Sequence, residues 1–312
     1  MSFSIAIHGG AGTILPEQMT PQLQQAIEAA LEQALRSGYD ILKLGGHAVD
    51  AVAIAVKVLE DCPHFNAGCG SVLTNNEMVE MDASIMDGNG KQAGAIAGVK
   101  HIRNPIELAK TVMKDSEHVF LIGDGAESFA FDQGFTYTEQ DYFYTDRRYD
   151  QLISMKEKGL FALSESRYPD DNKYGTVGAV ALDQHGNLAA ATSTGGITNK
   201  KYGRVGDSAV IGAGTWAENG VVAVSTTGMG EYFLQESVAS DLAARVRYLG
   251  ETISQAGENI IQGRLKDRGG EGGLIAMDKN GHACFAMNSS GMYRGVIDLN
   301  GHLEIKIYAD QE

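Results

Sequence analysis

Five segments of the sequence combine glycine with small hydroxyl or polar residues, which suits a site where backbone approaches a ligand. Glycine has no Cβ, so its peptide can come close to a bound molecule or adopt a positive φ. Taken alone, each segment is more readily explained as a tight turn in a glycine-rich protein. The segments are His8-Gly9-Gly10-Ala11-Gly12, Asn66-Ala67-Gly68, Gly175-Thr176-Val177-Gly178, Thr192-Ser193-Thr194-Gly195-Gly196 and Thr226-Thr227-Gly228-Met229-Gly230.

The junction between Gly175 and Thr176 is the most informative of these places. A polar stretch ends there, and an apolar run that predicts a buried strand begins one residue later. Threonine is ordinary at the start of a strand. However, Thr194 lies at the end of the next predicted strand, and hairpin pairing would bring it back beside Thr176. Four further residues would complete a pocket by supplying a cation, a carboxylate, a hydroxyl and backbone N–H donors: Arg204, Asp207, Thr227 and Gly228.

Phosphate and dinucleotide motifs are incomplete. Residues 9–12 lack the Gly-Lys-Ser/Thr ending of a P-loop, and Phe233 stands where a dinucleotide fingerprint has its third glycine. A more general feature remains, because the N–H groups of Gly228 and Gly230 lie at the start of a predicted helix, where negative charge is favoured. That charge would belong to a ligand carboxylate or to a developing oxyanion.

Zinc-based and serine-based hydrolysis find little support. Cys62, His64 and Cys69 do not follow a regular zinc spacing and have no matching second pair. His8 has no partner motif and is expected to be structural. The sequence contains no G-x-S-x-G elbow, so a Ser-His-Asp hydrolase of that class would have no nucleophile.

Hydrophobic periodicity predicts the elements that would position these residues in the first half of the chain. A strand over residues 3–7 precedes a helix from Pro21 to Arg36, which Gly38 ends or bends. A second helix, Ala48 to Leu59, is apolar on nearly every side and is typical of a helix buried on a sheet. The other elements expected are strands at 78–86, 92–99 and 118–122, helices at 105–114 and 150–158, and an exposed mobile loop that ends at Lys173.

After Gly175 the pattern changes to apolar runs separated by X-Gly turns, which predicts an antiparallel meander. Several of these strands are continuously apolar, so both faces of their sheets should be covered. The runs are 177–183, 187–193, 221–225, 273–278, 283–288 and 303–308, with long helices at 231–248 and 253–262. Helices on both sides of stacked antiparallel sheets give a four-layer αββα sandwich, here expected as one domain over residues 1–312.

Composition argues against several other classes of protein. Glycine accounts for 39 of 312 residues, but with 5 prolines and no three-residue period the chain is neither collagen-like nor a linker. The net charge of −15 disfavours nucleic-acid binding. No apolar run approaches the roughly 18–20 residues of a membrane span, and no basic segment opens a signal peptide. Three cysteines, an odd number, favour a reducing cytoplasm.

Together these motifs resemble the plant-type asparaginase / isoaspartyl peptidase family of N-terminal nucleophile hydrolases, in its bacterial form. The resemblance covers nearly the whole chain in the right order, and it implies the same αββα fold as the periodicity. The matching segments are Ile7–Gly12, Cys62–Gly68, Met81–Gly88, Gly175–Ala181, Ala191–Gly196, Gly203–Ser208 and Thr227–Glu231.

The resemblance implies a precursor that cuts itself between Gly175 and Thr176. The products would be an α subunit of residues 1–175 and a β subunit of residues 176–312. Thr176 would then be the nucleophile, and its own α-amino group, with a reference pKa of about 7.7–8.0, would act as general base. No catalytic histidine and no catalytic cofactor are required.

The resemblance also implies roles for further residues. Asn66 and Thr194 would support or orient the nucleophile, and Thr227 and Gly228 would form the oxyanion hole. Arg204 would hold the substrate carboxylate and Asp207 its ammonium group, and the backbone of Gly230 would also contact the substrate. Without the resemblance, Arg204 and Asp207 would be explained as a loop ion pair between near neighbours, usually worth about 0–1 kcal/mol when exposed.

A sodium-binding loop is implied as well. Backbone carbonyls would hold the ion, which suits a hard cation and leaves the thiols without a metal role. The carbonyls carried over are those of Leu59, Glu60, Cys62, Phe65, Ala67 and Cys69.

The expected activity is hydrolysis of β-aspartyl (isoaspartyl) dipeptides and L-asparagine, with release of L-aspartate through a β-aspartyl-enzyme ester. The resemblance implies a dimer of αβ pairs, and no nucleic-acid or membrane partner is expected. Two alternatives remain open. A glycosylasparaginase would favour a secretory signal and disulfides, and a non-catalytic, glycine-rich β-sandwich binding protein would stay uncut.

Overall fold

The computed structural model describes residues 2–157 and 175–309 of the chain. The polar loop predicted to end at Lys173 lies largely outside these residues, whereas the junction between Gly175 and Thr176 lies inside them. Within the described ranges, no helix is both long and apolar enough to cross a membrane.

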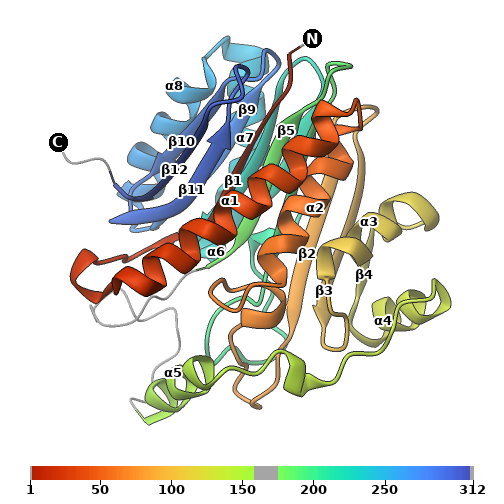
Figure 1. Cartoon of the computed structure of the whole chain (residues 1–312), viewed down its shortest axis with the longest axis vertical. Coiled ribbons are helices and arrows are strands. Elements are labelled where there is room, and N and C mark those ends of the chain that lie inside the picture. Colours follow the sequence, from red (N-terminus) through yellow and green to blue (C-terminus); the bar gives the residue numbers. More distant parts are fainter. Residues whose placement is uncertain (1, 158–174, 310–312) are drawn as a thin grey trace.

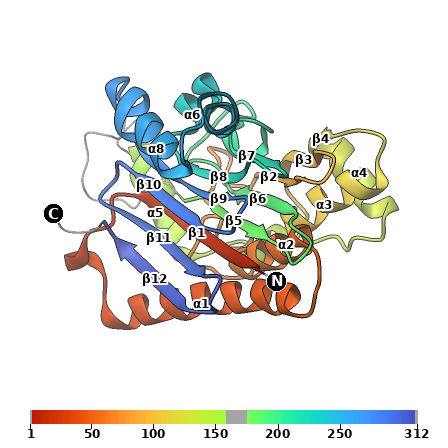
Figure 2. The same cartoon turned by 90° about the horizontal axis from the view of Figure 1, so that it is seen from above.

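Two β-sheets lie face to face, and helices cover the outer face of each (Figure 1). Helices α1 (Pro21–Lys43) and α2 (Ala48–Glu60) pack on the larger sheet. Helices α6 (Gly230–Glu236) and α8 (Ile253–Glu258) lie on the opposite side of the molecule, over the smaller sheet (Figure 2). The predicted αββα sandwich is therefore confirmed.

The larger sheet has eight strands among the described residues, and all neighbours are antiparallel except β3 and β4. From edge to edge its strands are β12 (Leu303–Tyr308), β11 (Gly291–Ile297), β1 (Ser4–Gly12), β5 (Val177–Leu182), β6 (Leu188–Thr194), β2 (Met81–Asp87), β3 (Gln92–Val99) and β4 (Phe120–Ile122). Because β1 separates β5 from β11, this sheet is not the simple meander that the turns predicted. The hairpin of β5 and β6 is formed as expected.

The smaller sheet is an antiparallel meander in the order β10-β9-β8-β7. Its strands are β7 (Thr215–Glu218), β8 (Val222–Gly228), β9 (Gly272–Asp278) and β10 (Ala283–Met287). The sequence pattern did not predict β7, which has four residues, or β11, in which glycine and arginine interrupt the apolar run. Both strands are formed because neighbouring strands satisfy their backbone.

Helix α1 begins at the Thr20 cap, whose hydroxyl accepts a hydrogen bond from the backbone N–H of Leu23. It does not end near Gly38 but continues to Lys43. A Cβ on Gly38 would overlap the side chain of Ile5 and lie 2.9 Å from the carbonyl oxygen of Ala51. This glycine is therefore needed for close packing against β1 and α2 and does not break the helix.

The long helix predicted at 231–248 is divided. Ser237 has a φ of 49°, in the left-handed region, and separates α6 from α7 (Val238–Ala244), which a π-helical turn at Arg245–Leu249 follows. Similarly, α8 gives way to a π-helical segment at Asn259–Leu265. Consequently no long regular helix runs along the smaller sheet in the described chain.

Two of the remaining α-helices pack against strands β2–β4, and another lies at the lower edge of the molecule in Figure 1. They are α3 (Pro105–Asp115), α4 (Gly123–Asp132) and α5 (Asp146–Glu157). Helix α4 was not predicted, because two glycines in its first turn weaken the helical pattern.

Candidate active site

The hydroxyl of Thr176 lies against the hydroxyl of Thr194, as the hairpin predicted. Thr176 immediately precedes β5 and Thr194 ends β6, where Val177 pairs with Ser193. The Thr176 Oγ1 donates to Thr194 Oγ1 at 3.2 Å, and Thr194 Oγ1 in turn donates to the carbonyl oxygen of Gly175 at 3.1 Å. Thr176 is 7% exposed. The Thr194 hydroxyl thus connects the Thr176 hydroxyl with the carbonyl of the preceding residue.

Asn66 supports this arrangement from the loop after α2. Its side-chain Nδ2 donates to the carbonyl oxygen of Gly196 at 2.7 Å, and its backbone carbonyl oxygen accepts from the N–H of Gly195 at 3.1 Å. The N–H of Gly196 donates to Thr194 Oγ1 at 3.0 Å, so Asn66 and Thr194 hold the same turn. A Cβ on Gly175 would lie 2.8 Å from the Cβ of Asn66, which leaves room only for glycine.

Thr227 and Gly228 end β8 on the smaller sheet. Thr227 is fully buried, and its Oγ1 accepts a hydrogen bond from the N–H of Ala11 at 3.2 Å. Gly228 has a φ of 150°, and a side chain there would overlap the carbonyl oxygen of Glu271. The conformation at Gly228 therefore requires glycine. Helix α6, which begins at Gly230, has only seven residues before the break at Ser237.

Arg204 forms a two-pronged ion pair with Glu231. Its Nε donates to Glu231 Oε1 at 2.8 Å and its Nη2 to Oε2 at 2.9 Å. Burial alone would raise the pKa of Glu231, but the hydrogen bonds and charge of Arg204 bring it below its usual value. The ion pair of Arg204 is thus formed with a residue 27 positions away, and not with Asp207 as the alternative explanation from the sequence would have it.

Asp207 lies next to this pair and is 4% exposed. Its Oδ2 accepts a hydrogen bond from Thr226 Oγ1 at 2.6 Å. Burial raises the pKa of Asp207 to about 6, although Thr226 and the charge of Arg204 act in the opposite direction. A Cβ on Gly230 would lie 2.9 Å from both Arg204 Nη2 and Asp207 Oδ1, so the three residues converge and need a glycine between them.

Asp82 connects the Arg204 group with the Thr176 group. On β2 it is the register partner of Thr194, and its Oδ1 accepts from the N–H of Gly98 at 2.9 Å. Burial raises the pKa of Asp82, whereas the charges of Lys200 and Arg204 lower it. The guanidinium of Arg204 is therefore close enough to act on a carboxyl group beside Thr194.

The loop predicted to bind sodium follows α2 and contains a short 3₁₀ turn at Gly68–Gly70. A Cβ on Gly68 would overlap the carbonyl oxygen of Glu60, and one on Gly70 would overlap that of Phe65. The glycines thus let the loop pack directly against the carbonyl groups of Glu60 and Phe65. The Glu60 side chain is used elsewhere, because its Oε1 accepts from Ser193 Oγ at 2.6 Å. Among the described residues, no three His, Cys, Asp or Glu side chains gather as a metal site.

Comparison with known proteins adds independent evidence. The sequence profile of the asparaginase family matches residues 1–307. The chain belongs to this family. It is 49% identical over 292 residues to the isoaspartyl peptidase of Escherichia coli (strain K12), covering 93% of this chain and 91% of that protein. It is 43% identical over 308 residues to the isoaspartyl peptidase/L-asparaginase of Rattus norvegicus, covering 98% and 89%.

A relative from Homo sapiens, also an isoaspartyl peptidase/L-asparaginase, is 45% identical over 280 residues and covers 89% of this chain and 87% of that protein. These matches bear out the resemblance drawn from the motifs. They extend across both halves of the chain, so the segments that carry Thr176 and Arg204 both fall within the family match.

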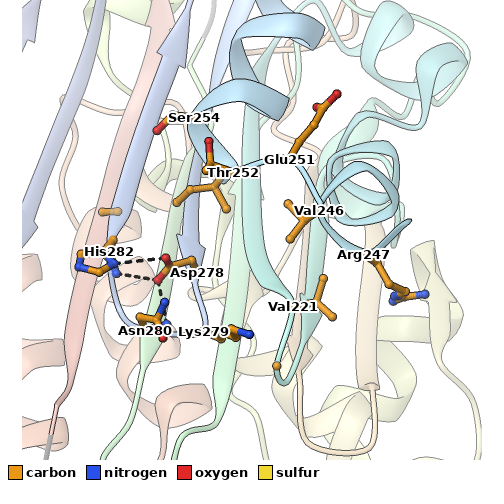
Figure 3. A pocket seen from close by; sticks show the side chains of 13 residues that line it. Val221, Val246, Arg247, Glu251, Thr252, Ser254, Asp278, Lys279, Asn280 and His282 are labelled. Carbon is orange, nitrogen blue, oxygen red and sulfur yellow. Dashed lines mark hydrogen bonds and ion pairs between the residues drawn. The ribbon is translucent and has the colours of Figure 1, made fainter. Parts of the chain in front are cut away.

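A cavity of about 490 Å³ in this family member lies away from these residues, at the Val222 end of β8 (Figure 3). Apart from the exposed Lys279, its charged groups pair with one another or with neighbours. Asp278 accepts from the N–H groups of Asn280 and His282, and Arg247 forms an ion pair with Glu218. Most charged groups of the cavity are therefore already paired, and the candidate site is at the other end of the strand.

Sequence analysis did not assign Asp82 and Glu231, although both lie in the site. For Glu231 a signal was present, because it follows Gly230 in the Thr227–Glu231 segment and opens a helix. Its partner is set by tertiary structure, since the loop of Arg204 folds back onto the start of α6.

Proposed function

We propose that the protein is a threonine hydrolase that releases L-aspartate from isoaspartyl dipeptides and from L-asparagine. The observation that carries the proposal is the contact of the Thr176 hydroxyl with Thr194, which also donates to the Gly175 carbonyl. The names of the relatives, isoaspartyl peptidase and isoaspartyl peptidase/L-asparaginase, support the substrate class.

The first step of the proposed mechanism is self-cleavage. The Thr176 Oγ attacks the carbonyl carbon of Gly175, the peptide C–N bond breaks, and the acyl group moves from nitrogen to oxygen as an ester. Water hydrolyses this ester, which leaves a carboxylate on Gly175 and a free α-amino group on Thr176. The hydrogen bond from Thr194 to the Gly175 oxygen supports this step, because it favours negative charge there.

In the mature enzyme the new α-amino group accepts the proton of the Thr176 hydroxyl as this attacks the substrate. Its reference pKa of about 7.7–8.0 leaves part of it neutral near pH 7. The attack forms a β-aspartyl ester and expels ammonia or the amino group of a dipeptide, and water then releases L-aspartate. Thr194 orients the nucleophile, and Asn66 supports it through the turn at Gly195 and Gly196.

Substrate binding is assigned to the groups around Arg204. Its guanidinium holds the substrate α-carboxylate, and Glu231 fixes the orientation of that guanidinium from one side. Asp207, ionised above about pH 6, holds the α-ammonium. Thr227 and the N–H of Gly228 form the oxyanion hole, and the backbone of Gly230 completes the contacts.

We further propose that the loop after α2 holds a structural sodium ion through the carbonyl groups carried over by resemblance. Gly68 and Gly70 support this assignment, because they let the loop fold tightly around the carbonyl groups of Glu60 and Phe65. The ion would stiffen the loop that carries Asn66 and would take no part in the reaction.

We propose a dimer of αβ pairs in the cytoplasm. Support for an interface comes from the apolar side chains that β4 and the end of α4 expose, among them Phe120 and Ile122, which are 42% and 68% exposed. The three cysteines are free thiols, which supports a reducing compartment. Light scattering on the purified protein would test the assembly, and a particle with the mass of one chain would contradict it.

A denaturing gel and a coupled aspartate assay test the function together. The proposal expects two fragments of roughly 19 and 15 kDa from a 33.3 kDa chain, and release of L-aspartate from both substrate classes. A single intact band in active protein would contradict the proposed mechanism. An intact and inactive protein would favour the binding-protein alternative.

A further inference from the structure

Four asparagines in the sequence are followed directly by glycine, and each of these pairs lies in a turn of the described structure. Such pairs mark turns between strands, and the proposed function uses none of them. They are also the pairs in which asparagine reacts most readily with its own backbone, because glycine has no Cβ to shield its nitrogen. The pairs are Asn89-Gly90, Asn219-Gly220, Asn280-Gly281 and Asn300-Gly301.

The reaction of such a pair makes asparagine thermolabile and needs no enzyme and no reagent except water. The backbone nitrogen of the glycine attacks the side-chain carbonyl carbon of the asparagine and loses its proton, and the side-chain amide leaves as ammonia. Water then opens the cyclic imide at either of its carbonyl groups. One opening gives aspartate, and the other gives an isoaspartyl linkage, in which the chain continues through the β-carboxyl group. The first step requires a free glycine N–H and a mobile asparagine side chain.

In two of the pairs the glycine N–H is already hydrogen-bonded. The N–H of Gly281 donates to the carbonyl oxygen of Asp278 at 3.0 Å. The N–H of Gly301 likewise donates to the carbonyl oxygen of Asp298 at 2.9 Å. Figure 3 shows the first of these turns, where the Asp278 side chain also accepts from the N–H of Asn280 at 2.8 Å. Attack by either glycine nitrogen would first have to break the hydrogen bond that closes its turn.

In a third pair the asparagine side chain is fixed. Asn219 follows β7 on the smaller sheet, and its Oδ1 accepts from the N–H of Leu188 at 2.8 Å. Its Nδ2 donates to Asn187 Oδ1 at 2.8 Å. Both ends of the side-chain amide are therefore bound to the turn between β5 and β6 on the larger sheet. The amide would have to give up both contacts to reach the nitrogen of Gly220.

The Asn89-Gly90 pair has neither restraint. It lies at the tip of the β2–β3 hairpin, where Asp87 pairs with Gln92, and both residues of the pair are exposed. Within the described chain, neither the Asn89 side chain nor the Gly90 N–H has a hydrogen bond. An added Cβ on Gly90 would meet nothing within 4 Å, so the space around this residue is open. Both requirements of the first step are thus met.

The flanks of this hairpin tip are held in place. The N–H of Gly88 donates to the carbonyl oxygen of Leu188 at 2.7 Å, and its carbonyl oxygen accepts from the N–H of Asn219 at 3.2 Å. On the other side, Lys91 Nζ lies 3.2 Å from Glu218 Oε1. The free pair therefore lies between two fixed points, and its side chain can turn towards the backbone without unfolding of the sheet.

We propose that Asn89 is a site of spontaneous modification in the folded protein, where the Gly90 nitrogen displaces ammonia and the residue becomes aspartate or isoaspartate. It should react before the other three asparagines. At Gly281 and Gly301 one hydrogen bond must break, which slows the reaction roughly threefold to tenfold. At Asn219 two must break, so the reaction there should be slower still.

The modified turn lies away from the proposed active site. Strand β2 runs from Asp87 at this turn to Asp82 beside Thr194, a distance of about 17 Å at the usual rise per residue. Each modified chain gains one negative charge, which adds to the net charge of −15. The reaction needs neither Thr176 nor self-cleavage, so it does not depend on the proposed function.

Mass spectrometry of the aged full chain tests the proposal. The purified protein is kept near neutral pH and digested at intervals, and the conversion of amide to carboxyl is followed in the peptides that carry the Asn-Gly pairs. We expect the Asn89 peptide to change first, into two products of equal mass that separate by chromatography. Equal or faster change at another Asn-Gly pair would overturn the proposal, as would an Asn89 peptide that stays unchanged.

Unfolded protein is the control for the sequence itself. In denaturant all of the pairs lose their hydrogen bonds, so their rates should converge. If Asn89 leads by the same factor in denaturant, its neighbours in the sequence set the rate, and the structural explanation is wrong.

Two matched variants separate the sites by charge. Asn89→Ser removes the reacting amide, and Asn300→Ser removes another exposed amide whose glycine N–H is bonded. On isoelectric focusing, the first acidic form to appear with age should vanish in Asn89→Ser and persist in Asn300→Ser. Its persistence in Asn89→Ser would overturn the proposal. Thr176→Ala should form it at the wild-type rate, and a slower rate would show that the enzyme and not the local geometry makes the products.

Discussion

Strand β8 has two ends of opposite character. At Val222 it borders the open cavity of about 490 Å³, which is lined by Val221, Val246 and several charged side chains (Figure 3). At Gly228 it ends among buried threonines, a glycine held at a φ of 150° and a guanidinium fixed by a carboxylate. The first end has an open cavity, but the second has the groups that chemistry needs.

The difference shows that an open cavity indicates a functional site less well than a cluster of polar side chains whose orientations are fixed by their neighbours. At the cavity, Asp278 is satisfied by its own turn and by His282, so its charge is used locally. At the other end, the Thr176 hydroxyl is held in a buried hydrogen bond. Burial raises the pKa of the nearby Asp207 carboxyl group, and neighbouring groups partly oppose that shift. Variants at the two ends should therefore differ sharply in effect.

Replacement of Thr176 should have the largest effect. Thr176→Ala removes the proposed nucleophile, so the chain should stay intact and hydrolysis should fall on the order of a thousandfold or more. A denaturing gel and the aspartate assay measure the two losses, with Thr176→Ser as the control that keeps a hydroxyl. Normal cleavage of Thr176→Ala would show that another group attacks Gly175.

Gly175→Ala should slow cleavage by roughly tenfold to hundredfold, because its Cβ would lie 2.8 Å from that of Asn66 and overpacking costs about 1–3 kcal/mol. The matched control is Gly125→Ala on α4, where an added Cβ meets nothing within 4 Å. Cleavage is followed over time after synthesis of the chain. Equal rates for the two variants would show that the site tolerates a side chain.

Arg204→Ala should raise KM at least about tenfold, since it removes the charged partner of the substrate carboxylate. Glu231→Gln keeps the shape but weakens the restraint on Arg204, so KM should rise by a smaller factor and self-cleavage should persist. Steady-state kinetics with an isoaspartyl dipeptide measure both. An unchanged KM in Arg204→Ala would reduce its role to the ion pair with Glu231.

The pKa of Asp207 predicts a moderate pH effect. Above about pH 6 the carboxylate is ionised and holds the substrate ammonium. As pH falls from 7 to 5 it becomes protonated, so KM should rise about tenfold. In Asp207→Asn, KM should be high and nearly independent of pH over this range. A wild-type KM that stays flat down to pH 5 would contradict the assigned role.

The cavity end should give the smallest effect. Lys279→Gln removes an exposed charge at its rim, and we expect kcat/KM within about twofold and the free energy of unfolding within about 0.5 kcal/mol. Thermal melting and the aspartate assay measure this. A large loss of activity would break the comparison, because it would connect the cavity with the distant end of β8.

Much of the fold could be predicted because its signals are local. The β5–β6 hairpin follows from two apolar runs and an X-Gly turn, and its register then brings Thr194 to Thr176. Prediction failed where the tertiary structure overrides the conformational preference of the local sequence. Gly38 lies inside α1 because α2 packs there, and Ser237 divides a helix that periodicity predicted as continuous.

The sequence by itself determined the family, the hairpin beside Thr176 and most residues of the proposed site, because these depend on motif identity and short-range pairing. Only the tertiary structure decided which groups satisfy one another across the sheets. Glu231 is the ion-pair partner of Arg204. Ser225 contacts the ring of His8, 217 positions away in the sequence, in space that a side chain on Gly178 would fill. Buried polar groups must find partners wherever the fold brings one within reach, and periodicity does not encode such pairings.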